Sequence, residues 1–315
     1  MRIQSLRTLD ADSEALLRMR ALDRAHDVEH NLQQMQRALE AGRVSAVCLY
    51  DDLDMARGLS MWRWYGSGQT HVQVLLLYMQ SIAPPVLGEA LVDYVFSELV
   101  RVVSLQAIEV RVRDDSPGVR AAWARRDLIF FERCRMVRTL RQPPLPLVPL
   151  PDGYRVVRWE EDHQAEVERL AVEAYNGSIE AVAVPDMEGS GVVKNLRKLR
   201  AGEPSRAGSW CPDASLVAVN KRGDVVGYIA TQRSADSALI ADLGVHPAHR
   251  RRGLARLLVV RSMAACLKQG LSAASFAVTT RSPVRQLCNR LGFQTTDCGE
   301  VAIWWHDGRQ LAWRE

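Results

Sequence analysis

A short stretch in the C-terminal half, residues 239–255, combines a strand, a loop and a helix start in one order (LIADLGVHPAHRRRGLA). The apolar run ending at Val245 predicts a buried strand, and Gly253 is expected to begin an amphipathic helix. Backbone amides at a helix N-terminus are unpaired and lie at the positive end of the helix dipole. The three arginines 250–252 in front of them therefore indicate an anion-binding loop. Gly253 and the small Ala255 let the backbone approach that anion closely.

A second motif lies downstream at Leu287–Phe293 (LCNRLGF). Together, the two motifs resemble the GNAT superfamily of N-acetyltransferases, whose loop Arg/Gln-x-x-Gly-x-Gly/Ala corresponds here to Arg250–Ala255. The resemblance implies an α/β fold, with a mixed, mostly antiparallel sheet flanked by helices, and acetyl-CoA as co-substrate. By the same resemblance, the residues expected to bind this co-substrate are Leu243, Gly244, Val245, Arg250, Arg251, Arg252, Gly253, Leu254 and Ala255.

A proline-rich segment at residues 141–153 divides the 315-residue chain into two halves. Proline removes backbone donors and restricts the preceding residue, so this segment predicts an extended linker between two domains, 1–140 and 154–315. A long loop inside one domain is the alternative. The second half shows the element order β-α-α-β-β-β-α-β-α-β, which is the order that the GNAT resemblance implies for its catalytic domain.

The first half is predicted to be a degenerate copy of the second. It has a strand-like run at 71–79, and a helix is expected to open at Gly88, which aligns with Gly253. The counterpart of the arginine loop, residues 84–87, holds two prolines and no cation, and Glu89 would repel a diphosphate. We therefore expect a non-catalytic copy that packs on, or completes, the active domain. Coincidence of generic α/β patterning is the alternative.

The composition limits the other classes of function. A hydrophobic content of 47% and a charged content of 25% are typical of a soluble globular protein. The net charge of +4 is small, so a nucleic-acid partner is not indicated. The N-terminus lacks an apolar signal segment and no run reaches membrane-spanning length, so neither export nor a membrane partner is expected. The six cysteines form no C-x-x-C pair, which predicts reduced thiols, no metal site and a cytoplasmic protein.

Acetyl transfer to an amine needs a base, because an alkylammonium has a pKa of about 10.4. Asp242 lies at a strand position where the family often places Glu or Asp, so it is the first candidate for the base. The alternative is that its carboxylate has no catalytic role and either faces solvent or pairs with an arginine. His246 is the second candidate base. The family resemblance also directs a backbone N–H near Val245 at the thioester carbonyl. The general-acid tyrosine of the family motif is replaced by Cys288, which either donates the proton or is an ordinary helix residue.

The acceptor side is expected within residues 176–212, and Glu160, Glu161 and Asp186 are further candidate bases near the acceptor site. The leading hypothesis is an N-acetyltransferase that acts on a primary amine of a small molecule or peptide. A CoA-thioester-binding regulatory or sensor protein with little turnover is the alternative, and a nucleic-acid module using the arginine cluster is a third. The sequence sets neither the acceptor nor the oligomeric state.

Overall fold

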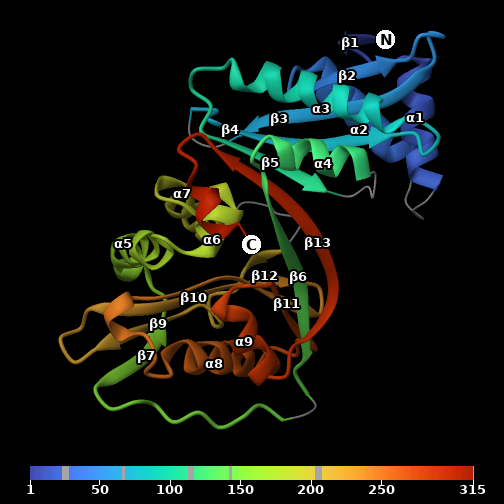
Figure 1. The fold of residues 1–315 in the computed structure, drawn as a ribbon. Coiled ribbons are helices and arrows are strands. Elements are labelled where there is room, and N and C mark those ends of the chain that lie inside the picture. Colours follow the sequence, from blue (N-terminus) through green and yellow to red (C-terminus); the bar gives the residue numbers. More distant parts are fainter. Residues whose placement is uncertain (23–27, 66–67, 113–116, 142–143, 203–207, 315) are drawn as a thin grey trace. The chain divides into compact units, whose positions relative to one another are not determined.

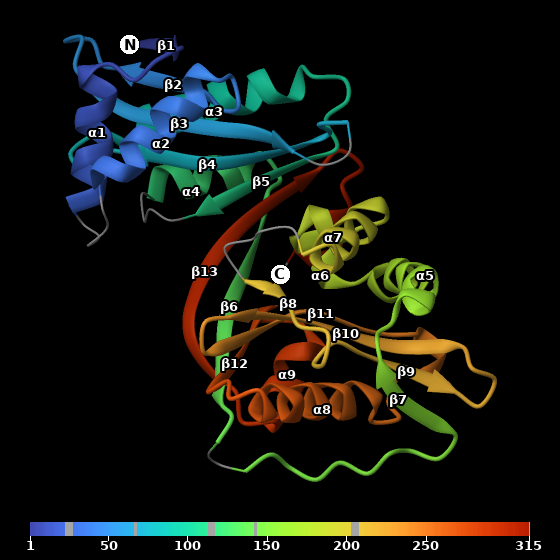
Figure 2. The same ribbon diagram turned by 180° about the vertical axis from the view of Figure 1, so that it is seen from behind.

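The computed structural model describes residues 1–22, 28–65, 68–112, 117–141, 144–202 and 208–314. The chain forms two compact units, of which unit 1 is Met1–Phe131 with Gly299–Glu315 and unit 2 is Glu132–Cys298. Each is a mostly antiparallel sheet with helices on both faces, as the family resemblance predicts (Figures 1 and 2). No helix among the described residues is long and apolar enough to cross a membrane.

Unit 1 is built on six neighbouring strands. Their order is β1 (Arg2–Leu6), β2 (Ser45–Tyr50), β3 (Ala56–Tyr65), β4 (His71–Met79), β5 (Ala107–Val112) and the end of β13 (Gln294–Trp305). One face packs against α1 (Ala11–Leu22) and α2 (Val28–Glu40), and the other against α3 (Pro85–Val100) and α4 (Pro117–Arg125). Because successive side chains of a strand point to opposite faces of the sheet, each strand packs apolar residues against both layers of helices.

Unit 2 repeats this plan. Its strand order is β6 (Ile129–Thr139), β12 (Ala273–Thr279), β11 (Ser237–Val245), β10 (Val225–Ser234), β9 (Leu216–Asn220) and β7 (Tyr154–Arg158), with the short β8 (Ser209–Trp210) also on β10. The two faces are covered by α8 (Leu254–Lys268) with α9 (Pro283–Arg290), and by α5 (Gln164–Tyr175) with α7 (Ser190–Arg200). The short α6 (Ile179–Ala183) connects the latter two. The strands and helices predicted for this half are confirmed.

A shared irregularity supports the predicted internal repeat. In unit 2 the register of β10 on β11 shifts at Ala241, which lies between the paired residues Ile240 and Asp242. In unit 1 the register of β3 on β4 shifts at Leu75, at the equivalent place. A β-bulge redirects the side chains that follow it, and generic α/β patterning gives no reason for two bulges at matching positions.

The boundaries of the units differ from the predicted ones because each half supplies the last strand of the other's sheet. Strand β6, from the first half, pairs antiparallel with β12 of unit 2. The end of β13, from the second half, pairs antiparallel with β5 of unit 1. Residues 132–140, predicted to belong to the first domain (1–140), therefore belong to unit 2. Residues 299–315, predicted to belong to the second domain (154–315), belong to unit 1.

The proline-rich segment is also not a linker between the units. It connects β6 to β7, and both of these strands belong to the sheet of unit 2. Leu145 and Val148 pack against the core beneath α8 and α9, and the Pro144 carbonyl accepts a hydrogen bond from Arg138. The prolines exclude helix and strand as expected, but the extended chain lies on one unit as a long loop.

The cysteines are not all reduced. Cys134 on β6 and Cys298 on β13 form a disulfide, which corrects the prediction of six free thiols. Their sulfur atoms lie close to a carboxylate oxygen of Glu132, but bonded sulfurs are not thiolate ligands for a metal. The free cysteines among the described residues are Cys48, Cys211, Cys266 and Cys288, and all four are buried.

Gly292 of the downstream motif allows β6 to lie on α9. Its φ is +78°, and a Cβ built there would lie 2.7 Å from Nη1 of Arg138, a buried residue of β6. That guanidinium donates to the Leu291 carbonyl at the end of α9.

Gly292→Ala is expected to destabilise the protein by about 1–3 kcal/mol, because it adds backbone strain and displaces Arg138. Gly299→Ala is the matched control, since no atom lies within 4 Å of its Cβ position and its φ is not positive. Urea unfolding of both variants measures the difference, and equal midpoints would contradict this role of Gly292.

Candidate acyl-transfer site

An open strand edge lies at the centre of unit 2. The parallel pairing of β11 with β12 covers only Ser237–Leu239, so the later part of β11 has no strand partner on that side among the described residues. The His246 N–H donates to the Val226 carbonyl across to β10. Since amides alternate between the two edges of a strand, the N–H groups of Leu243 and Val245 point towards the open edge. The Val245 N–H, which the family resemblance directs at the thioester carbonyl, therefore lies on the open edge.

The helix that follows has an N-terminus suited to an anion. Gly253 is the N-cap of α8 with φ +84°, and no side chain caps the helix. The side chain of Arg251 is exposed, and its φ is +63°. This backbone conformation is rare for a non-glycine residue and recurs where ligands are held. The first amides of α8 and the Arg251 guanidinium together form a positively charged loop of the predicted kind.

The other two arginines make contacts within the protein. Arg250 donates from Nε to the Val245 carbonyl (3.1 Å) and from Nη2 to the Ala174 carbonyl near the end of α5 (2.9 Å). Arg252 donates to the Tyr154 hydroxyl on β7 (3.2 Å). Arg250 therefore fastens the loop to β11 and α5, whereas the prediction gave all three arginines to the phosphates.

Asp242, the predicted base, is buried beside the open edge. Its side chain is 5% exposed, and its Oδ1 accepts hydrogen bonds from the Tyr175 hydroxyl (2.6 Å) and from the Leu243 N–H (2.7 Å). Burial raises the pKa of Asp242 to about 6, because it disfavours the charged form more than these hydrogen bonds stabilise it. The interpretation of Asp242 as a solvent-facing or arginine-paired carboxylate is therefore wrong.

Two tyrosines lie beside Asp242 and a second buried carboxylate, Glu180, acts on one of them, Tyr175; sequence reasoning missed all three. Tyr228 is fully buried on β10, and its ring lies over Gly244, where a Cβ would be 2.3 Å from Cε1. Burial and the charge of Asp242 raise the pKa values of Tyr175 and Tyr228 well above the ordinary range. Glu180 on α6 accepts a hydrogen bond from the Thr279 N–H at the end of β12 (3.4 Å), and burial raises its carboxyl pKa.

The remaining candidate bases are engaged elsewhere. His246 accepts from the Ala248 N–H through Nδ1, and its Nε2 lies 3.0 Å from a Glu173 carboxylate oxygen. Glu161 pairs with Arg200 at 2.8 Å at the start of α5, the opposite end of that helix from Tyr175. Glu160 lies at the same end of α5, where its N–H donates to Nδ1 of His163 and its carbonyl accepts from Arg200. Asp186 contributes its backbone carbonyl to Asn195.

Cys288, the predicted candidate acid, is fully buried in the core of unit 2 on α9. Burial raises its pKa to about 12. A thiol enclosed by apolar side chains cannot reach a leaving group at the open edge of β11, so the structure supports the alternative of an ordinary helix residue.

Comparisons with known proteins agree with this geometry. Residues 190–293 match the model of the acetyltransferase (GNAT) family, and the chain therefore contains a GNAT domain, within unit 2. A search of curated proteins finds no match.

Solved structures extend the likeness over the whole chain. A GCN5-related N-acetyltransferase from Sphaerobacter thermophilus is similar at 17% identity and TM-score 0.64, covering 96% of this chain and 95% of the other. A tandem GNAT protein from the clavulanic acid biosynthesis pathway is similar at 14% identity and TM-score 0.52, covering 96% and 98%. At such identities the likeness establishes the fold alone.

Proposed function

We propose that unit 2 transfers the acetyl group of acetyl-CoA to a primary amine by direct attack on the thioester. The observation that carries this proposal is a buried carboxylate, Asp242, on the strand whose open edge leads to the N-terminus of α8. In this proposal the amides of α8 and Arg251 hold the diphosphate, and the Val245 N–H stabilises the oxyanion of the tetrahedral intermediate.

The chemistry requires Asp242 in its ionised form. With a pKa of about 6, a large fraction of Asp242 is ionised at neutral pH, and its basicity is higher than that of an ordinary aspartate. It would take the proton of the attacking amine, directly or through a water. Since the leaving thiol has a pKa near that of an ordinary cysteine, about 8.5, the thiolate can depart without a dedicated acid. The burial of Cys288 is therefore compatible with turnover.

Unit 1 is proposed to be a copy of the same fold that binds no CoA. The connection from β4 to α3 is residues 80–84, whereas the connection from β11 to α8 is residues 246–253 and so three residues longer. Helix α3 begins at Pro85, so Gly88 lies inside it and does not open it as the sequence suggested. A Cβ at Gly118 on α4 would lie 3.0 Å from the Pro85 carbonyl, which leaves no room between these helix starts for a diphosphate.

Calorimetric titration with CoA tests the cofactor assignment. One CoA is expected per chain, and Arg251→Gln is expected to weaken binding about tenfold, since a charge-assisted contact to phosphate is lost. Arg222→Gln, in the exposed turn between β9 and β10, is the matched control. Two equal sites per chain would disprove the proposal for unit 1. Unchanged affinity in Arg251→Gln would disprove the role of Arg251 in the loop.

Cys288 replaces the tyrosine of the family motif and is buried, so the site has no general acid at this position. This favours one alternative function, a CoA-responsive sensor with little turnover. Release of free thiol from acetyl-CoA over a broad panel of amines separates the two functions. Transfer to at least one amine supports the enzyme, and CoA binding without thiol release for any amine supports the sensor.

A further inference from the structure

A cavity in unit 1 lies away from the proposed transfer site, where β1 ends beside the start of β2. Its volume is about 360 Å³, and its lining comes from β1, β2, β3 and the end of α2. Ser45 is paired with Trp62 across β2 and β3, and Ser5 with Val47 across β1 and β2. The strand register therefore places residues of three strands side by side along the wall of the cavity.

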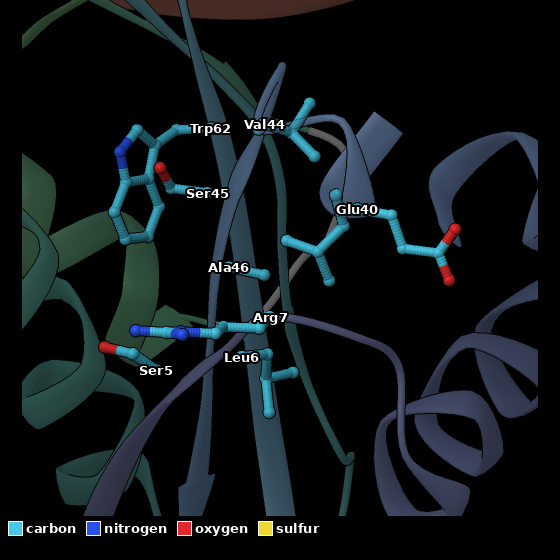
Figure 3. Close-up of a pocket in the computed structure, with 10 residues that line it drawn as sticks. Ser5, Leu6, Arg7, Glu40, Val44, Ser45, Ala46 and Trp62 are labelled. Carbon is cyan, nitrogen blue, oxygen red and sulfur yellow. The ribbon is translucent and has the colours of Figure 1, made fainter. Parts of the chain in front are cut away.

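Four hydrogen-bond donors gather on one side of these strands. Figure 3 shows the side chains of Ser5, Arg7, Ser45 and Trp62 pointing the same way, while Leu6, Val44 and Glu40 point to the other side. Within the described part of the chain, none of these four side chains has a hydrogen-bond or ion-pair partner. Trp62 is only 8% exposed, so its indole ring is a largely buried part of the wall.

The charge of this wall is positive and uncompensated. The nearest carboxylate of the lining, Glu40, accepts a hydrogen bond from Gln36 on its own helix and points away from Arg7. A guanidinium without a carboxylate partner, two hydroxyls and an indole N–H form a set of donors that an anion satisfies. The indole ring beside them offers an apolar surface for the rest of a ligand.

We propose that this cavity binds a small organic anion, whose carboxylate or phosphate group is held by Arg7 with the hydroxyls of Ser5 and Ser45, and whose apolar part lies on Trp62. The ligand is distinct from acetyl-CoA, because none of the residues that line the cavity belongs to β4, to α3 or to residues 80–84 between them, the counterpart of the proposed CoA loop. Unit 1 would then have a binding function of its own, independent of the transfer chemistry.

Calorimetric titration of the full-length protein with benzoate and with benzamide tests the requirement for charge, because the two have nearly the same shape. Benzoate is expected to saturate one site per chain, with benzamide about tenfold weaker or undetectable. Phenyl phosphate and inorganic phosphate are further arms. Tighter binding of phenyl phosphate than of inorganic phosphate supports the apolar contribution of Trp62, and equal binding overturns it.

The variants locate the site. Arg7→Gln is expected to weaken benzoate binding about tenfold, while Arg43→Gln, an exposed arginine next to the cavity that does not line it, leaves the affinity within about twofold. Trp62→Phe keeps an aromatic ring in the core but removes the donor, and is expected to weaken binding by a smaller factor. Equal losses in Arg7→Gln and Arg43→Gln, or no saturable binding of any of these anions, would overturn the proposal. The rate of amine acetylation is expected to be unchanged in Arg7→Gln, so failure here leaves the proposed transfer function intact.

Discussion

Replacing Asp242 with asparagine is expected to lower kcat by about a hundredfold or more, while CoA binding stays within about twofold. General-base catalysis contributes a factor of about 10²–10⁴, and asparagine cannot accept the proton. The side chain is nearly isosteric and can still accept from the Tyr175 hydroxyl, so the buried cluster is retained. Steady-state kinetics with the best amine of the panel and calorimetry with CoA give the two readouts. A loss of less than about tenfold would remove Asp242 from the mechanism.

The pH profile gives an independent measure of the same group. Because the folded pKa of Asp242 is raised to about 6 and the ionised form is the active one, kcat is expected to be high above pH 6 and to fall below it. Tyr175→Phe removes a hydrogen bond that stabilises the ionised form, so the acidic limb should move to higher pH by about one unit. Tyr65→Phe in unit 1 is the matched control, since its hydroxyl donates to a different carboxylate, Glu109 (3.1 Å). A limb that moves equally in both variants would contradict the assignment.

The sequence predicted the parts of the site that depend on local rules. The strand before Val245, the glycine at the start of α8 and the carboxylate at 242 follow from periodicity, capping and the family motif, and the structure has each in its expected element. The partners of these residues were not predictable in the same way. Tyr175 comes from the end of α5 and lies 67 positions from Asp242, so no local pattern connects the two.

The arginine loop shows the limit of reasoning from charge alone. Three consecutive arginines before a helix indicate an anion, but they do not say which guanidinium is free. Arg250 is drawn to two backbone carbonyls, and one of these is near the end of α5, where the helix dipole favours a cation. Only the packing of α5 against the loop in the folded structure shows that these carbonyls compete with an anion for Arg250.

The strand exchange could not be read from the sequence. A strand pairs equally well with either copy of a repeated sheet, because its alternation of apolar and polar residues fits both. Long-range contacts accompany the pairing of β6 and β13, such as the hydrogen bond from Arg138 to the Leu291 carbonyl and the disulfide between Cys134 and Cys298. Proline content suggested a division at 141–153, but prolines indicate irregular backbone and do not distinguish a long loop from a domain boundary.

Because β6 and the end of β13 are exchanged between the two sheets, two fragments of similar length are expected to differ greatly in stability and CoA binding. A fragment of residues 132–298 contains all of unit 2 and is expected to unfold cooperatively and to bind one CoA. A fragment of residues 154–315 follows the proline segment, but lacks β6 and with it the fully buried Met136 and Leu140 and the contacts of Arg138. Burial of each such apolar side chain contributes about 1.5–3 kcal/mol. Their loss, with the whole β6–β12 ladder, is comparable to the total stability of a domain, about 5–15 kcal/mol.

The shorter fragment is therefore expected to lack a cooperative thermal transition, to expose the edge of β12 and to aggregate. Circular dichroism melts, size-exclusion chromatography and CoA calorimetry on both fragments provide the comparison. A third fragment, residues 132–315, contains both β6 and the end of β13 that pairs with unit 1. It therefore shows whether the defect of residues 154–315 comes from the missing β6 or from the unpaired end of β13. It should bind CoA as residues 132–298 do, although its segment 299–315 has left the sheet of unit 1. Cooperative melting and undiminished CoA binding by residues 154–315 would mean that β6 is dispensable, and that the predicted boundaries describe the folding unit after all.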